Sequence, residues 1–475
     1  MTLTHRNPTP TPSPTHAPRS KPRHADRSAR TGHGLAGLAL AFALLGPAAR
    51  AAEPAGWPQF RGPGGQGHSD VKGLPLEWAE DRNVTWRTPL PGQGWSSPVV
   101  EDGKVWLTAA VTLPATAEDR ARRLKQNTGN QPLNVAKAVL FHALCVDLAT
   151  GRLEHDIELF REDEPQWVHQ LNSYASPTPV LHRGRLYCHF GAFGNACVDT
   201  QTAKLVWTQR ELRVNHENGP GSTPVLHNQK LIFHLDGSDT QSIAALDAST
   251  GQLAWRTPRT GKMRDDPQLK KAYGTPLIVD YRGKPALISP AADWVYAYDP
   301  DTGEELWKLS YGVLGFSTVP KPVAGHGMVY LATSFLKSEL LAIRIDGQGD
   351  KPEPHIAWRM NKGAPQMPSP LLVGDEVYVI SDQGGIVTCC DARTGAILYR
   401  ERIEGNYSAS PLYADGRIHF FSREGLTTVL KPGRTFEVLA KNKLDGSLMA
   451  SPAVAHGALL LRTDKALYRI ELKKG

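Results

Sequence analysis

The sequence predicts an all-β protein, an eight-bladed β-propeller of four-stranded antiparallel blades that is closed by an N-terminal strand in the last blade. Three observations support this prediction. A strand–turn–strand unit repeats along the chain, eight blocks open in a similar way, and the last block lacks one strand. Repeats of this length are typical of propellers.

The repeated unit is clearest at residues 245–255, where one strand ends, a tight turn follows and a second strand ends on an aromatic residue. Asp247 can accept hydrogen bonds from the backbone N–H groups of the turn, and Gly251 supplies the positive φ that closes it. Trp255 ends the second strand. The corresponding residues of a second clear copy are Asp299, Gly303 and Trp307.

Eight blocks each open with a proline and a short apolar strand, followed by a hairpin turn and another strand. After the long first block, the openings recur at roughly 41–52-residue intervals, which suits a four-stranded blade. Alternating apolar strands joined by short turns leave almost no room for helices. The openings are Ser97-Pro98, Ser176-Pro177, Thr223-Pro224, Thr275-Pro276, Val319-Pro320, Ser369-Pro370, Ser410-Pro411 and Ser451-Pro452.

The last block, residues 451–472, has sequence for only three strands, whereas residues 84–87 form a short strand without a partner nearby. We therefore expect residues 84–87 to complete the last blade, which would remove the exposed edges of an open array. An insertion at 111–138 lengthens the first block and contains a charged segment that predicts a short helix. Residues 83–475 then form a single propeller domain.

Residues 1–51 are interpreted as an export signal with a long Pro- and Arg-rich n-region. A short apolar run at 35–45 is followed by a small-residue pattern, so we expect cleavage between Ala51 and Ala52. The mature chain would then be periplasmic or extracellular. Residues 52–82 are expected to form an irregular arm rich in glycine and proline.

The basic character of the chain belongs mostly to this leader. Residues 1–51 contain seven basic residues and one acidic residue, a net +6 of the +7 of the whole chain, so the mature protein is close to neutral. This balance argues against nucleic-acid binding through a basic surface. No apolar run approaches the length of a membrane helix, so no integral membrane segment is expected in the mature protein.

The Ala-x-Asp-x-x-Thr-Gly-x-x-x-Trp unit resembles the tryptophan-docking repeat of the pyrroloquinoline-quinone (PQQ) type propellers, over essentially all of the mature chain. The resemblance implies that each tryptophan packs on a neighbouring blade. It does not imply one function, because the architecture serves both quinoprotein dehydrogenases and non-catalytic proteins such as the BamB-type outer-membrane assembly lipoprotein. Residues 57–65 and 94–98 are also similar to exported PQQ-like repeat proteins.

Cys389 and Cys390 are adjacent, and quinoprotein dehydrogenases place a vicinal disulfide against their cofactor. Here Cys389 takes the repeat position of Ala245 and Ala297, which requires a small buried apolar residue, so we interpret the pair as structural. The family's metal-binding Glu and Asn and its catalytic Asp have no convincing equivalents. The sequence thus predicts no catalytic residue, metal site or cofactor, and PQQ with Ca²⁺ belongs to the alternative of a quinoprotein.

Cys188 and Cys197 are expected to face each other across a hairpin if residues 191–194 form its turn. An exported protein can form a disulfide at such a place, although cross-strand geometry is often strained. Two buried thiols are the alternative.

Polar side chains gather where one block passes to the next and in the loops between second and third strands. A propeller brings such loops together around the mouth of its central channel, a usual place for a ligand. The alternative is that these groups satisfy strand ends and channel water. The candidate ligand-binding residues are His169, Asn172, His216, Asn218, Asp236, Asp239, Asp293 and Asp382.

We therefore expect an exported, non-catalytic module for binding or protein scaffolding, with a protein or small-ligand partner at the loop face. One alternative is a quinoprotein-type oxidoreductase that uses PQQ. Another is a BamB-like role in outer-membrane protein assembly, against which the absence of a lipid-anchor cysteine at the cleavage point argues. The sequence leaves the oligomeric state open.

Overall fold

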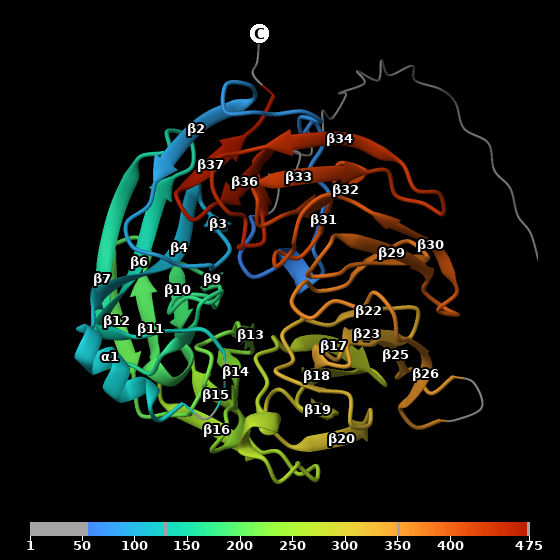
Figure 1. The fold of residues 1–475 in the computed structure, drawn as a ribbon, viewed down its shortest axis with the longest axis horizontal. Helices are drawn as coiled ribbons and strands as arrows, with labels where there is room; N and C mark the ends of the chain where they lie inside the picture. The colour runs from blue at the N-terminus through green and yellow to red at the C-terminus, as the bar shows by residue number, and fades with distance from the viewer. Residues whose placement is uncertain (1–55, 128, 130, 349–351, 473–475) are drawn as a thin grey trace, which may run out of the picture. The chain divides into compact units, whose positions relative to one another are not determined.

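The computed structural model describes residues 56–127, 129, 131–348 and 352–472. In this part of the chain, eight antiparallel blades of four strands surround a common centre, and a short strand, β1 (His68–Ser69), pairs in parallel with the sheet of blade 7 (Figure 1). The all-β, eight-bladed propeller predicted from the sequence is confirmed. The export signal expected at residues 1–51 lies outside the described residues.

The first strand of each blade is the nearest to the centre and the fourth lies at the outside (Figure 1). Blades 1 and 2 contain β3 (Val99–Glu101), β4 (Lys104–Pro114), β6 (Ala136–Asp147) and β7 (Leu153–Asp163), then β9 (Val180–His182), β10 (Arg185–His189), β11 (Asn195–Asp199) and β12 (Lys204–Gln209). Blades 3 and 4 contain β13 (Val225–His227), β14 (Lys230–Asp236), β15 (Gln241–Asp247) and β16 (Leu253–Pro258), then β17 (Leu277–Tyr281), β18 (Lys284–Pro290), β19 (Trp294–Tyr298) and β20 (Glu305–Ser310).

The second half of the ring repeats this arrangement. Blades 5 and 6 contain β22 (Val323–Gly325), β23 (Met328–Ala332), β25 (Leu340–Arg344) and β26 (His355–Met360), then β27 (Leu371–Val373), β28 (Glu376–Ile380), β29 (Ile386–Asp391) and β30 (Ile397–Arg402). Blades 7 and 8 contain β31 (Leu412–Ala414), β32 (Arg417–Phe421), β33 (Leu426–Leu430) and β34 (Val438–Lys443), then β35 (Ala453–Ala455), β36 (Ala458–Arg462), β37 (Ala466–Ile470) and β2 (Val84–Pro89).

The closing strand of blade 8 comes from the N-terminal part of the chain. β2 pairs antiparallel with β37, so that Val84 lies opposite Ile470 and Pro89 lies opposite Ala466. This pairing covers the outer edge of β37 and closes the ring. The predicted closure by an N-terminal strand is confirmed.

The blades are held together by apolar side chains from both faces of their inner strands. In blade 2, Leu186 packs with Phe141 of blade 1, whereas Tyr187 packs with Phe233 of blade 3. Successive residues of a strand point to opposite faces, so a strand buried between two neighbours carries apolar side chains on both faces. The core is therefore a set of layers between blades.

Short elements connect or cover the blades. α1 (Ala117–Leu124) lies between β4 and β6, and its N-cap Thr116 accepts a hydrogen bond from the Asp119 N–H at 3.1 Å. No helix in the described part of the chain has the length and apolar character needed to cross a membrane. The remaining elements are η1 (Pro63–Gly65), η2 (Gly191–Phe193), η3 (Pro267–Lys270), β1 (His68–Ser69), which pairs with β31, β5 (Leu133–Asn134), which pairs with β8 (Val168–His169), and β21 (Gly315–Phe316), which pairs with β24 (Phe335–Leu336).

The repeated turn joins the third and fourth strands of a blade. Asp247 Oδ1 accepts hydrogen bonds from the backbone N–H groups of Ser249 and Thr250 at 3.0 and 2.9 Å, and Gly251 has a φ of +74°. Trp207 of the preceding blade lies over Gly251 and donates its indole N–H to the carbonyl oxygen of Ala248 at 3.0 Å. The turn thus closes one blade and receives the aromatic side chain of the preceding blade.

The register of blade 2 corrects the expected pairing of Cys188 with Cys197. Cys197 lies opposite Tyr187, and Cys188 lies opposite Ala196. The connection contains one residue more than expected, because Phe190 joins η2 in the turn and donates its N–H to the Gly194 carbonyl at 2.9 Å. The two thiols therefore point to opposite faces of the sheet and are both free and buried.

Two of the expected openings are also shifted. In six blades a Ser or Thr precedes the proline by one position and the first strand by two. In blades 2 and 5 the residues at this position are Thr178 and Lys321, two residues later than the predicted openings at Ser176 and Val319. Each of these two segments contains two prolines, two positions apart. The prediction took the first proline as the start of the block, whereas the second one precedes the strand.

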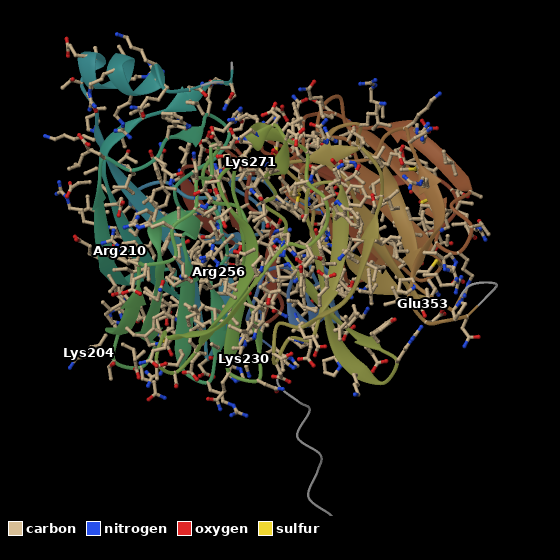
Figure 2. The ribbon with its side chains drawn as sticks, turned by 90° about the horizontal axis from the view of Figure 1, so that it is seen from below. Lys204, Arg210, Lys230, Arg256, Lys271 and Glu353 are labelled. Carbon is tan, nitrogen blue, oxygen red and sulfur yellow. The ribbon has the colours of Figure 1, made fainter. Side chains whose placement is uncertain are left out.

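The two ends of the propeller carry different structures. Figure 2 shows Lys271 at the end that also bears α1, and Lys204 and Lys230 at the opposite end. Because Lys204 follows a repeated turn, we call that end the turn end, and we call the end with Lys271 the mouth.

Candidate functional site

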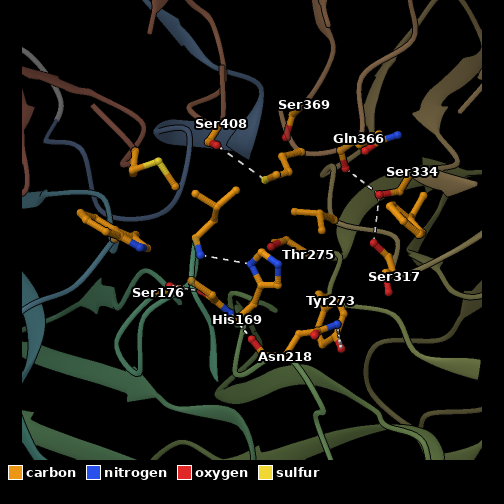
Figure 3. A pocket seen from close by; sticks show the side chains of 18 of the residues that line it. His169, Ser176, Asn218, Tyr273, Thr275, Ser317, Ser334, Gln366, Ser369 and Ser408 are labelled. Carbon is orange, nitrogen blue, oxygen red and sulfur yellow. Dashed lines mark hydrogen bonds between the residues drawn. The ribbon is translucent and has the colours of Figure 1, made fainter. Parts of the chain in front are cut away.

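A cavity of about 690 Å³ occupies the mouth end of the central channel (Figure 3). The segments that lead into all eight blades line it, and Phe60 of the N-terminal arm lines it as well. The site is therefore built from residues that are far apart in the sequence.

A ring of hydroxyl groups surrounds the channel at the start of the blades. Backbone N–H groups donate to the hydroxyl oxygen of the next blade at 2.9–3.1 Å, as Ser97 does to Thr178 and Ser369 does to Ser410. These hydroxyl groups thus fix the spacing of neighbouring blades. The members of this hydroxyl ring are Ser97, Thr178, Thr223, Thr275, Ser369, Ser410 and Ser451, and all of them line the cavity.

A second ring lies two residues before the first in each blade. The chain is extended here, so residues two apart point the same way, toward the channel. This ring varies in chemistry, in contrast to the uniform hydroxyl ring. Its members, which all line the cavity, are Trp95, Ser176, Gly221, Tyr273, Val319, Met367, Ser408 and Met449.

His169 projects into the cavity from β8 (Figure 3). Its Nδ1 accepts the backbone N–H of Leu171 at 3.1 Å, which assigns the proton of a neutral ring to Nε2. Burial and the nearby guanidinium of Arg423 lower the pKa of His169. The ring therefore presents a neutral N–H donor to the cavity.

Asn172 and Asn218 line the cavity and tie two blade openings together. Asn172 Nδ2 donates to the carbonyl oxygens of Asn218 and Pro220 at 2.9 and 3.1 Å, and its Oδ1 accepts from Ser176 at 2.6 Å. Asn218 Nδ2 donates to the Tyr273 hydroxyl at 3.3 Å, while its Oδ1 has no partner among the described residues. Asn218 Oδ1 can therefore accept a hydrogen bond from a ligand.

His216 does not reach the cavity lining. Its Nε2 accepts the backbone N–H of Ala192 at 3.0 Å, and its ring lies against Gly191 beneath the turn of blade 2. Burial lowers its pKa to about 3, so it is neutral. No group of three or more His, Cys, Asp or Glu in the described residues has the arrangement of a metal site.

Asp236 lies in a buried polar network between blades 3 and 4. Arg259 donates to both of its carboxylate oxygens, at 3.0 and 2.7 Å, and also to Ser289 at 2.7 Å. His234 Nε2 lies 2.8 Å from Ser289 Oγ, but His234 Nδ1 is 3.9 Å from Asp236. The side chains are fully buried and the carboxylate is held by Arg259, so this serine, histidine and aspartate join two blades and do not form a nucleophilic site.

The other three candidate aspartates support loops near the cavity without lining it. Asp239 accepts the backbone N–H of Asn215 at 2.8 Å, and Asp293 forms an ion pair with Arg264 at 2.5 Å. Asp382 accepts the N–H groups of Gln366 and Met367, and burial raises its pKa to about 6. These carboxylates hold loop backbone in place.

Of the eight candidates, three line the cavity, and most of its lining was not singled out in the sequence. The missed residues include aromatic, amide and thioether groups and one lysine. The second ring could have been recognised in the sequence, because its members all lie two residues before the position of the hydroxyl ring. The main missed residues are Phe60, Trp95, Gln131, Gln268, Lys271, Tyr273, Phe316, Phe335, Gln366, Met367, Gln383 and Met449.

The cavity carries little charge. No Asp or Glu lines it in the described part of the chain, and Lys271 is its only lysine or arginine. Lys271 Nζ donates to Gln268 at 2.5 Å, and burial lowers its pKa. Such a lining suits binding through hydrogen bonds and apolar contact better than acid–base catalysis.

The comparisons with known proteins identify the family. A family model described as outer membrane protein assembly factor BamB matches residues 76–217 and 196–475. The chain belongs to this PQQ-like propeller family. No curated protein sequence matches the chain.

Solved structures show the same fold at low sequence identity. BamB from Moraxella catarrhalis is 12% identical with a TM-score of 0.53, covering 82% of this chain and 99% of its own. A europium-containing methanol dehydrogenase is 11% identical with a TM-score of 0.58, covering 87% of this chain and 91% of its own. Quinohemoprotein alcohol dehydrogenase from Comamonas testosteroni is 13% identical with a TM-score of 0.54, covering 90% of this chain and 82% of its own. These likenesses show the fold alone.

The residues present do not fit PQQ with Ca²⁺. Calcium prefers several carboxylate or carbonyl oxygen ligands, whereas the described lining of the cavity offers no carboxylate. Cys389 and Cys390 lie in β29, fully buried between blades, and do not line the cavity. Burial raises the pKa of both thiols to about 12, as for structural cysteines.

Proposed function

We propose that this chain is a non-catalytic binding module that holds an extended, uncharged segment of a partner protein in the mouth of its channel. The observation that carries the proposal is the lining of the cavity: hydroxyl, amide, aromatic and thioether groups from all eight blade openings, without a carboxylate among the described lining residues. Hydroxyl and amide groups match the N–H and C=O groups of an extended backbone, which need partners when they leave water.

The rim of the cavity supports a protein partner. Leu171 and Phe335 line the cavity and are 40% and 49% exposed, and Leu336, next to Phe335 in β24, is 55% exposed. Met367 and Met449 add flexible thioether side chains, which adapt to different apolar partners. The family description as an outer membrane protein assembly factor agrees with a protein partner. Export after cleavage between Ala51 and Ala52 is part of this proposal.

Site-specific photo-crosslinking tests the proposal. The photoreactive residue p-benzoylphenylalanine replaces Phe335 at the rim in one variant and Ile397 on the outside of blade 6 in a control variant. The two positions are matched in exposure, at 49% and 48%. We expect protein adducts from position 335 and none from position 397. The attached segment is identified by mass spectrometry, synthesised as a peptide and titrated into the mature chain.

The titration gives the deciding result. The proposal requires saturable binding of an uncharged peptide that weakens at least tenfold in Phe335→Asp. Equal adducts from both positions, or a peptide that does not bind, would contradict it. Addition of PQQ and Ca²⁺ to the same protein is the second arm, because substrate-dependent dye reduction would favour a quinoprotein instead.

A further inference from the structure

In blade 5 the position that corresponds to the hydroxyl ring carries no hydroxyl group. At Lys321 of blade 5, the backbone N–H still donates to the hydroxyl of Ser369 at 3.0 Å, but the side chain is a lysine. This side chain is only 2% exposed. Its ammonium has no hydrogen-bond or ion-pair partner among the described residues. A buried ammonium without a partner is costly, so the position demands an explanation.

The N-terminal arm covers the end of the channel that lies opposite the mouth. Gly67 O accepts the N–H of Tyr413 in blade 7 at 2.9 Å, and Gln66 Oε1 accepts that of Ala324 in blade 5 at 3.2 Å. The arm is blue in Figure 1, where η1 lies near the centre of the ring. Lys321 Nζ reaches this arm, since a Cβ built on Gly65 would lie 2.3 Å from it.

Arg61 of the arm is a second buried cation at the same place. It is 2% exposed, and only its Nη2 donates, to the carbonyl oxygen of Gln66 at 3.0 Å. Its Nε and Nη1 have no partner in the described part of the chain. Burial lowers the pKa of Arg61 to about 9, and burial together with Arg61 lowers the pKa of Lys321 to about 7. The two cations therefore destabilise each other.

Glycines leave room for the side chains of these two cations. Gly65 and Gly67 both have positive φ, at +69° and +80°. A Cβ on Gly67 would lie 2.6 Å from Arg61 Nη2, as close as the one on Gly65 lies to Lys321 Nζ within a few tenths of an ångström. Glycine-rich turns of this kind expose backbone N–H groups and are common in anion-binding sites.

Arg462 shows what a satisfied buried cation looks like in the same protein. It is also 2% exposed, but its Nη1 donates to Ser96 O, Ser96 Oγ and Thr108 O at 2.7–3.1 Å. Carbonyl and hydroxyl oxygens therefore satisfy Nη1 of Arg462, although burial lowers its pKa to about 9, as it does for Arg61. The described residues provide no such set of hydrogen-bond acceptors for Arg61 and Lys321.

We propose that Arg61 and Lys321 bind a small oxyanion, a carboxylate or a phosphate, at the arm-covered end of the channel. The anion would accept the free N–H groups of both side chains and replace the missing counter-charge. Arg61 offers free donors at Nε and at Nη1, and charge-assisted hydrogen bonds of this kind to an oxyanion are stronger than those between neutral groups. Neither Arg61 nor Lys321 lines the mouth cavity, so this site does not depend on the proposed protein-binding function.

Thermal unfolding of the mature chain tests the site. The protein is first dialysed at pH 9.5 to release any bound anion, because Lys321 and part of Arg61 are then neutral. Acetate or phosphate is then titrated from 0 to 10 mM at pH 6.0 and constant ionic strength set with sodium chloride. We expect a saturable rise in the melting midpoint of several degrees with at least one anion, and calorimetric binding at least tenfold weaker at pH 9.5.

Three variants separate specific binding from a general salt effect. Lys321→Met should abolish the saturable rise, and Lys321→Ser, which restores the hydroxyl ring, should do the same if the methionine variant fails to fold. Arg462→Met should lower the starting midpoint but keep the rise. The ranking of acetate and phosphate identifies the ligand class. An equal rise in Lys321→Met, or no saturable rise with either anion in the wild type, would overturn the proposal.

Discussion

The two ends of the propeller are built in different ways. At the turn end, Asp247 finds its hydrogen-bond partners within the next three residues, and the same arrangement recurs at Asp391. At the mouth, Asn172 bonds to carbonyl oxygens 46 and 48 residues away. Local chemistry can be copied from blade to blade, and the hydroxyl ring at the mouth is also repeated, whereas the contacts of Asn172 are made once. The turn end is therefore built mainly from repeated local contacts, and the mouth combines repeated contacts with contacts that occur once.

At the turn end, a neighbouring side chain requires the glycine of the turn in addition to its positive φ. The four turns that lie under a tryptophan carry Gly151, Gly251, Gly303 and Gly395, each with a Cβ position within 2.5–2.6 Å of the indole ring. In blade 2 the same position is Ala203, with a φ of +54°, and the preceding blade has His155 where others have tryptophan. A glycine is thus retained where the indole needs the space.

The largest effect is expected from removing the long-range closure of the ring. Replacement of residues 84–89 by alternating Gly and Ser removes β2 and exposes Leu467, Tyr468 and Ile470, which are fully buried. We expect a loss of most of the free energy of unfolding, which is about 5–15 kcal/mol for a typical domain. Chemical denaturation measures it. The same replacement at residues 70–73, which lie in the arm, is the control and should cost far less; similar losses would show that closure contributes little.

A pH-dependent effect is expected from the buried histidine at the mouth. Burial depresses the pKa of His216 to about 3, below the 6.5 of the unfolded state, so the unfolded state binds more protons below pH 6.5. Stability is therefore lost as the pH falls. His216→Gln should remove about 2–3 kcal/mol of this loss between pH 7 and pH 4.5. Urea unfolding at both values measures it, and the exposed His182→Gln should leave the slope unchanged.

The fold could be predicted from the sequence because its determinants are local and repeated. The aspartate, the glycine and the aromatic residue of the turn recur at fixed spacing, and the spare strand at 84–87 had one open place to fill. The predicted register of blade 2 was wrong because the turn contains one residue more than expected, which places Cys188 opposite Ala196. Because successive side chains point to opposite faces of a strand, a shift of one residue moves every side chain to the other face of the sheet.

The site was harder to predict because its residues are brought together by the ring. Sequence polarity singled out Asp236 and Asp293, yet each carboxylate is held by an arginine away from the cavity. Apolar members such as Phe335 and Met367 carry no chemical signal in the sequence. Only a comparison of the blade openings at the correct position, Thr178 in place of Ser176, would have revealed the second ring.

A steric effect is expected at the turn end. Gly251→Ala and Gly103→Ala place an alanine at similar φ, +74° and +71°. The Cβ at 251 would lie 2.6 Å from the Trp207 ring, whereas nothing lies within 4 Å of the one at 103. We expect a loss of about 1 kcal/mol at 103 from the left-handed backbone and about 2–3 kcal/mol at 251. Denaturation midpoints of the two variants give the comparison, and equal losses would leave backbone conformation as the sole reason for glycine.

The smallest effect separates the hydrogen bond of a tryptophan from its packing. Trp207 and Trp255 both lie over a glycine of the next blade, but only Trp207 Nε1 donates to a carbonyl, that of Ala248, at 3.0 Å, while Trp255 Nε1 has no partner among the described residues. Replacing each by phenylalanine removes similar ring area. Trp207→Phe should therefore cost about 1 kcal/mol more than Trp255→Phe, the usual net value of one hydrogen bond. Equal costs would mean that ring packing alone joins neighbouring blades at the turn end.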